Sequence, residues 1–231
     1  MLPGLSAVHP GGSAHSGIIT LVDHQSGSGK DNATYTFGEA WTGRVIAVGI
    51  SYAAGAVISS VTIGGVSATK QVAQTENDGI FGESHNAEIW TATVPTGTSG
   101  NITCTLASGS YVGFAMSVYS IGTVSETPTD SDKTSKVPAF DGDPINLSVT
   151  LTVATANSTV MGVGSMARIS SSSSTWSHGP TEDVDVQYLS YVSGTTASKM
   201  GVPSGAYQVE VDMDQHFTLN SGVMATACWD P

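Results

Sequence analysis

The chain has 231 residues, of which only 11% are charged, and 19 Asp and Glu outnumber 7 Lys and Arg to give a formal net charge of −12. A protein this acidic repels phosphate backbones, so DNA and RNA are excluded as expected partners. No apolar run approaches the roughly 20 residues of a membrane span, and no membrane association is expected. Abundant Ser, Thr and Gly favour short strands over helices.

Residues 1–16 contain Pro and Gly but no hydrophobic periodicity. We interpret them as an extended N-terminal arm that becomes ordered only against a partner. The first two strands are predicted at residues 17–23 (GIITLVD) and 33–37 (ATYTF).

The strongest β-signal lies in residues 43–70, GRVIAVGISYAAGAVISSVTIGGVSATK. Successive side chains of a strand point to opposite faces. The strand at 44–52 therefore places Ile46, Val48 and Ile50 on one large apolar face, opposite a face of small residues. A second strand at 57–63 precedes Gly64-Gly65, a pair that suits a hairpin turn.

Further strands are predicted along the rest of the chain, at 88–94, 101–106, 113–121, 145–153, 158–166, 186–192, 207–213 and 222–229. Leu147, Val149 and Leu151 alternate with hydroxyl residues in a way typical of half-buried strands. Residues 122–144 lack periodicity and are interpreted as a crossing.

The strands before and after this crossing follow in a similar order, which indicates an internal pseudo-repeat with halves at 17–121 and 145–231. We therefore predict an all-β protein. It is expected to be one antiparallel, jelly-roll-like sandwich domain over residues 17–231, with roughly a dozen short strands.

Cys104 and Cys228 both lie in alternating apolar stretches. Two buried free thiols are the favoured interpretation, and a bridge between late strands is the alternative. Trp41, Trp90 and Trp229 are expected in the core.

Trp176 lies among polar residues beside His178, in a stretch interpreted as a loop. An exposed Trp there could stack on a sugar or dock into a partner, so Trp176 and His178 are the candidate partner-binding residues. The alternative, a loop anchor that packs onto the sandwich, is the favoured interpretation.

Four Asp-x-Asp pairs occur, and in a strand residues i and i+2 share a face. Glu210, Asp212 and Asp214 would form the best such set of oxygen ligands for a hard cation. None of the pairs has the spacing of a calcium loop, so a solvated acidic face is favoured. We predict no metal site, no cofactor and no catalytic residues.

The stretches VTIGGVSAT, AEIWTATVPTGTSGNITCTL and GFAMSVYSI resemble a family of β-rich structural proteins of tailed bacteriophages. The likeness continues through LSVTLTV, STVMGVG and GVMATACW. It implies a virion component assembled in the host cytoplasm, as a capsid decoration (cement) protein or a tail-associated protein. The implied partners are the major capsid or tail protein and further copies of this chain. These stretches specify strands and turns, so no site residue follows from them.

Two other functions remain open. A tail-associated receptor- or carbohydrate-binding protein would use the same sandwich with Trp176 and acidic loops. A glycan-cleaving enzyme would require two carboxylates that face one groove.

Overall fold

The computed structural model describes residues 17–27, 30–54, 57–77, 84–109, 111–122, 125–137, 145–167, 173–189, 192–213 and 221–231. Within these ranges the chain forms seventeen strands and no helix, arranged in four antiparallel sheets. The prediction of an all-β sandwich fold is confirmed, but the chain forms two sandwiches, each with its own core, and not one, and the strands outnumber the expected dozen. The arm at residues 1–16 lies outside the described residues.

The first part of the chain forms roll 1, which has two facing sheets. Inner sheet 1 has the order β1-β9-β3-β7-β6, and outer sheet 1 has the order β2-β8-β4-β5. Its strands are β1 (Ile18–Ser26), β2 (Asn32–Thr36), β3 (Arg44–Ala54), β4 (Ile58–Ile63), β5 (Val66–Ser67), β6 (Thr69–Asn77), β7 (Ser84–Thr93), β8 (Ser99–Leu106) and β9 (Tyr111–Gly122).

The second part forms roll 2, with inner sheet 2 in the order β10-β17-β12-β15-β14 and outer sheet 2 in the order β11-β16-β13. Its strands are β10 (Asp130–Lys136), β11 (Ile145–Val153), β12 (Ser158–Ala167), β13 (Ser174–His178), β14 (Thr181–Leu189), β15 (Val192–Val202), β16 (Gly205–Met213) and β17 (Gly222–Trp229).

The two rolls have matching strand orders. Without the short strand β5, each roll has eight strands. Counted along the chain within each roll, the inner sheet has the strand order 1-8-3-6-5 in both. The second, seventh and fourth strands form the outer sheet. The chain crosses between the two sheets at most connections, which is the wrapping of a jelly roll.

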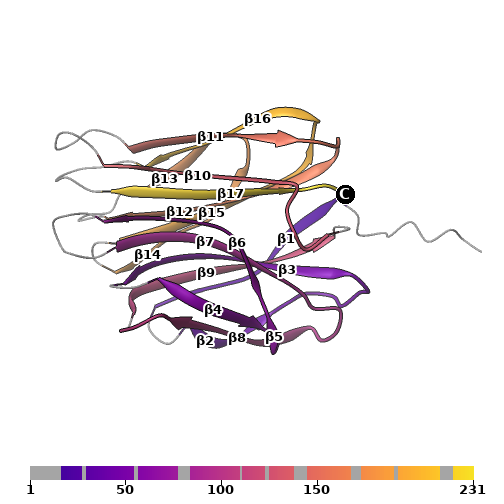
Figure 1. Ribbon diagram of the computed structural model, residues 1–231, viewed down its shortest axis with the longest axis horizontal. Helices are drawn as coiled ribbons and strands as arrows, with labels where there is room; N and C mark the ends of the chain where they lie inside the picture. The colour runs from indigo at the N-terminus through magenta and orange to yellow at the C-terminus, as the bar shows by residue number, and fades with distance from the viewer. Residues whose placement is uncertain are drawn as a thin grey trace, which may run out of the picture.

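The four sheets stack in layers. Figure 1 shows outer sheet 1 at the bottom and outer sheet 2 at the top, with the two inner sheets between them. Each outer sheet shares an apolar core with its own inner sheet, and the two inner sheets share a third core. The rolls are therefore packed back to back, with β3 of roll 1 facing β12 of roll 2.

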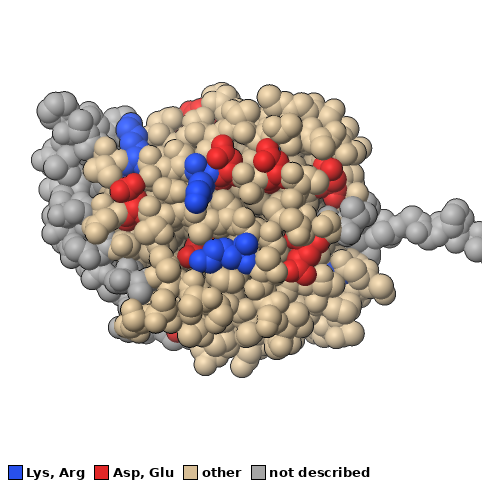
Figure 2. Space-filling view, viewed as in Figure 1, with Lys and Arg blue, Asp and Glu red and all other residues tan. Residues whose placement is uncertain are grey.

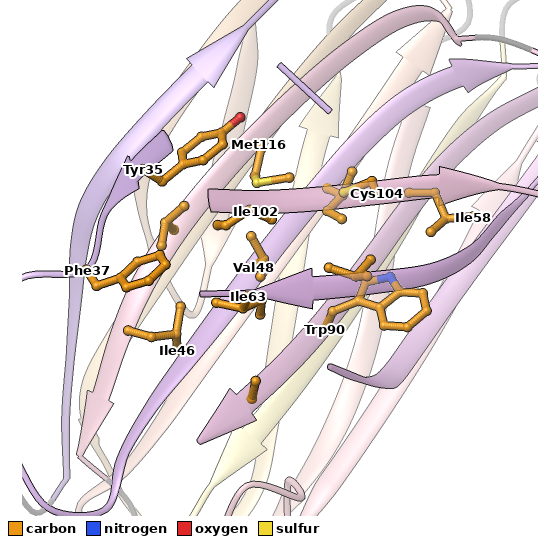
Figure 3. Close-up of a cluster of buried hydrophobic side chains, with 14 of the residues drawn as sticks. Tyr35, Phe37, Ile46, Val48, Ile58, Ile63, Trp90, Ile102, Cys104 and Met116 are labelled. Carbon is orange, nitrogen blue, oxygen red and sulfur yellow. The ribbon is translucent and has the colours of Figure 1, made fainter. Parts of the chain in front are cut away.

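Side-chain alternation on β3 builds two of these cores. Ile46, Val48 and Ile50 are fully buried between the sheets of roll 1, where Figure 3 shows Ile46 and Val48 among the aromatic and aliphatic side chains of the cluster. Val45 and Ala47, on the opposite face, pack into the core between the rolls. The predicted burial of Leu147, Val149 and Leu151 on β11 is also confirmed.

Gly49 allows the two rolls to approach each other. A Cβ atom at this position would lie 2.6 Å from Met161 Cε and 2.7 Å from Val163 Cγ2, both on β12. Real Cβ atoms do not come this close to other atoms. Because Gly49 has no side chain, Met161 and Val163 of roll 2 can pack against the backbone of β3.

The segment 122–144 is not a plain crossing, and this expectation was wrong. Its described part contains β10, which pairs with β17 along its full length and begins roll 2. The strand predicted at 186–192 is also wrong, because these residues hold the end of β14 and the start of β15, two strands that pair with each other.

The same aspartate bridge joins the sheet edges in both rolls. In roll 1, Asp23 Oδ2 on β1 accepts a hydrogen bond from the backbone N–H of Thr36 on β2, at 2.8 Å. In roll 2, Asp130 Oδ2 on β10 accepts one from the N–H of Thr152 on β11, at 2.5 Å. Because β10 and β11 correspond to β1 and β2 in strand order, this bridge is a shared feature of the two rolls.

Candidate functional site

A buried carboxylate lies in the core of roll 1. Glu88 on β7 has no exposed surface, and its two oxygens accept hydrogen bonds from Tyr52 Oη (2.7 Å) and Trp90 Nε1 (2.6 Å). Lys70 Nζ lies 3.2 Å from Glu88 Oε2 and donates to the carbonyl oxygen of Ile58 at 3.0 Å.

This cluster is suited to holding strands together. Burial, followed by the charge of Glu88, raises the pKa of Tyr52, so its hydroxyl remains a proton donor to the carboxylate. Both oxygens of Glu88 accept hydrogen bonds from side chains of the protein itself. The cluster joins β3, β6 and β7 around a charge that would be costly to bury alone.

A groove runs along the outer side of Lys70, where the edges of the two inner sheets lie next to each other. It has a volume of about 410 Å³ and is lined by β6 of roll 1, from Lys70 to Ala73, and β10 of roll 2, from Ser131 to Lys133. Figure 2 shows charges of both signs across the middle of this face, over β6 and β10. The volume lies within the range of small-molecule pockets.

Side chains from both rolls meet farther along these two strands. Gln74 Nε2 donates to Ser135 Oγ at 3.0 Å, and Ser135 Oγ donates to Glu76 Oε2 at 2.7 Å. The groove lining offers two ammonium groups, one carboxylate, an amide and a hydroxyl. Such a lining can bind a polar segment, but the Lys70 ammonium already pairs with Glu88.

A second buried charge ties two loops together. The Arg44 side chain is fully buried and donates to six backbone carbonyl oxygens, at residues 37–39 and at 94, 96 and 97, over 2.7–3.3 Å. Its guanidinium also lies 5.8 Å from the centre of the half-buried Trp41 ring, which is not in the core as expected. Burial lowers the pKa of Arg44.

Trp176 lies in a strand and not in the loop that was expected, and it is not the exposed residue that partner binding would need. It lies on β13 and is 9% exposed. Its indole packs directly against Gly162, so that a Cβ atom at residue 162 would lie only 2.5 Å from Trp176 Cη2. Trp176 Nε1 donates to Thr195 Oγ1 at 2.9 Å. The alternative interpretation, an anchor packed onto the sandwich, describes its position.

His178 remains at the surface of outer sheet 2. Its side chain is 62% exposed, and Nδ1 lies 3.4 Å from Glu210 Oε2 on β16. The structure therefore separates the two candidate partner-binding residues, because Trp176 points into the core and His178 is exposed on the same strand.

Glu210 and Asp212 share the outer face of β16, as the alternation predicted. Asn146 Nδ2 donates to Glu210 Oε1 at 2.8 Å and to Asp212 Oδ1 at 2.5 Å. Asp214 lies outside the described residues. Among the residues that are described, no group of three or more His, Cys, Asp or Glu side chains is arranged to hold a metal ion.

Cys104 and Cys228 are free and buried, each in the core of a different roll. Burial raises the pKa of the Cys228 thiol to about 11 and also raises that of Cys104. Both thiols are therefore protonated, unreactive core groups at neutral pH.

No family model, no curated protein and no solved structure matches this chain. In the part of the chain that the structure describes, no helix could span a membrane.

Proposed function

We propose that this chain is a non-enzymatic structural component of a phage particle, of the capsid-decoration (cement) class. The observation that supports the proposal is the pair of complete jelly rolls packed back to back in one chain. Jelly rolls recur in viral capsid proteins. Two of them joined through a buried core form a rigid block that offers two outer sheets and several strand edges to its neighbours.

The buried charges are consistent with a structural role. Glu88 and Arg44 are bonded to groups of the protein itself, and each holds separate strands or loops in place. Attachment to a shell would then depend on shape and on uncharged contacts. Repetition over a lattice adds avidity to each such contact.

The test is reattachment of the purified chain to particles of the phage that encodes it, prepared without this gene. We expect saturable binding at a fixed number of copies per particle, counted by quantitative mass spectrometry and located by reconstruction of the particle. Attachment should survive about 0.5 M salt, where exposed ion pairs are screened within a few ångströms. Binding without saturation, or release at this salt concentration, would contradict the proposal.

Jelly rolls also occur in lectins, so the same preparation should be applied to a glycan array. Binding to a glycan with no binding to the particle would support the receptor- or carbohydrate-binding alternative. Turnover of a polysaccharide that is lost when one Asp or Glu is replaced would support the glycan-cleaving alternative. Release from the particle by a chelator would place a metal ion among the acidic side chains.

A further inference from the structure

The strands of outer sheet 1 carry no charge. The structure describes every residue of β2, β4, β5 and β8, and none of them is Asp, Glu, Lys, Arg or His. Charged residues make up 11% of the whole chain, so the 21 residues of these strands (5, 6, 2 and 8 in turn) would hold about two of them at the average frequency. Alternation turns Ile102 and Cys104 of β8 into the core and leaves small polar residues on the outside. The outward polar residues of the three longer strands are Asn32, Thr34, Thr36, Ser59, Ser60, Thr62, Ser99, Asn101, Thr103 and Thr105.

These outward side chains bond to each other. Thr34 Oγ1 donates to Asn101 Oδ1 at 2.7 Å, and Thr103 Oγ1 donates to Asn32 Oδ1 at 3.1 Å. Both pairs bridge β2 and β8 at directly opposite positions. Because these two hydroxyls and two amide oxygens already have partners within the sheet, and each Thr also presents a methyl group, covering this part of the face would cost less than covering unpaired polar groups.

The corresponding face of roll 2 has a different chemistry. Outer sheet 2 has Glu210 and Asp212 on its central strand and the exposed His178 at its edge. The fold therefore does not require an uncharged outer sheet. Figure 2 shows the stacked sheets from the side, and there the lower part of the molecule, at the level of outer sheet 1, is almost entirely uncharged, whereas the charges lie across the middle and above.

We propose that outer sheet 1 is a self-association face, on which a second copy of this chain packs sheet against sheet. Two copies that each carry a net charge of −12 repel one another, and they can meet at least cost where neither has a charge. Depletion of charged residues is also one of the features of the centre of protein interfaces. This inference does not depend on the phage assignment.

The dimensions of outer sheet 1 give the area that the contact would bury. Four strands span about 19 Å, and the eight residues of β8 span about 27 Å. The other three strands are shorter, and the 21 residues of the four strands, at about 3.4 Å by 4.8 Å each, cover about 340 Å² per copy. Two copies would thus bury about 700 Å² in total, which is the size of weak and transient contacts. Val57 and Val66, two of the four large apolar side chains that stay exposed among the described residues, lie next to and on this sheet. We therefore expect a reversible dimer with a dissociation constant in the micromolar range.

Sedimentation equilibrium of the full chain between about 1 and 500 µM tests the proposal, since this range brackets a micromolar dissociation constant. We expect the mean mass to rise with concentration from 23.5 kDa toward twice that value. Raising the salt from about 0.05 to 0.5 M should strengthen the association, because it screens the repulsion between acidic copies. A monomer at all concentrations and at both salt levels would overturn the proposal, and the face would then be assigned to another partner.

Thr103→Glu places a charge at the centre of the face, opposite Asn32 and Thr62. We expect it to weaken dimerisation at least tenfold at low salt. Thr103→Gln, of similar size but uncharged, should change it less than threefold. Thr150→Glu makes the matched change at an exposed strand position of outer sheet 2, with the same change in net charge, and should leave dimerisation within twofold.

Thermal melts of all three variants verify that each is folded. If Thr150→Glu weakens dimerisation as much as Thr103→Glu, the association does not use outer sheet 1 and the inference is wrong.

Discussion

Gly49→Ala probes the contact between the two rolls at its centre. The new methyl group would lie 2.6 Å from Met161 Cε and 2.7 Å from Val163 Cγ2, so β12 or its side chains must move. Overpacking of this kind costs about 1–3 kcal/mol, and the better strand propensity of Ala returns about 0.5–1 kcal/mol of that. The expected net loss in the free energy of unfolding is about 1–2 kcal/mol.

Removing the obstructing side chain should rescue the variant. Met161→Ala alone leaves a cavity and should cost about 2–5 kcal/mol. In the double variant the alanine methyl group enters the space that Met161 Cε has left. The combined loss should therefore be smaller than the sum of the single losses by about 1 kcal/mol or more, a coupling typical of residues in contact.

Urea unfolding followed by far-UV circular dichroism gives each free energy. Gly100→Ala is the control, because its methyl group would crowd Phe37 in the core of roll 1 and not Met161. The pair Gly100→Ala and Met161→Ala should be additive within about 0.5 kcal/mol. If Gly49→Ala and Met161→Ala are also additive, the two inner sheets do not pack as described.

Three further outcomes follow from buried groups. Arg44→Met should lower the free energy of unfolding by at least about 3 kcal/mol in urea titrations, since it leaves carbonyl oxygens of two loops without a donor, and Arg44→Lys should recover only part of this loss. Trp176→Ala should cost about 3–5 kcal/mol by the same assay, with Trp176→Phe between it and the wild type; a loss below about 1 kcal/mol would mean that the indole is not part of the core. At alkaline pH the thiols of Cys104 and Cys228 ionise from about pH 9 in the unfolded chain, whereas the folded chain keeps them protonated up to about pH 11 or beyond. The folded chain then binds more protons, so the free energy of unfolding should fall by about 1.4 kcal/mol per thiol between pH 9 and 10.5, and Cys104→Ala should remove its share of the fall.

The strands with a clear hydrophobic pattern were predictable, and they include the edge strand β11 as well as the inner strand β17. The strands at 145–153 and 222–229 begin and end where the sequence pattern placed them. In β11 every second residue is buried and the residues between are exposed, so the pattern of two is complete. The turn at Gly64-Gly65 was also predictable, since both residues have positive φ angles, of 59° and 82°.

Most of the strands that were missed lie at sheet edges, although the missed strand β15 lies inside inner sheet 2 and the edge strand β11 was predicted. β6, β10 and β13 end their sheets, and no residue of β10 is buried. Edge strands avoid unwanted pairing by carrying polar and charged side chains, and this removes the alternation that identifies a strand in the sequence. The start of roll 2 was therefore mistaken for part of a crossing.

The candidate site residues depended on contacts between distant segments. Trp176 has polar neighbours in the sequence, and its burial depends on Gly162 and Thr195 of neighbouring strands. Glu88 lies in a stretch that reads as an apolar strand, and its partners Tyr52 and Lys70 come from two other strands. One signal was present in the sequence, a single acidic residue in a strand otherwise suited to the core.

Because both rolls belong to one polypeptide, their contact does not weaken when the protein is diluted. Between two separate chains, a contact centred on Gly49 and including hydroxyl pairs such as Tyr119 with Thr196 would dissociate when the protein became scarce. A covalent connection makes the encounter intramolecular, with an effective concentration that dilution does not change. The paired rolls should thus stay together at nanomolar protein, where a micromolar contact through outer sheet 1 has come apart.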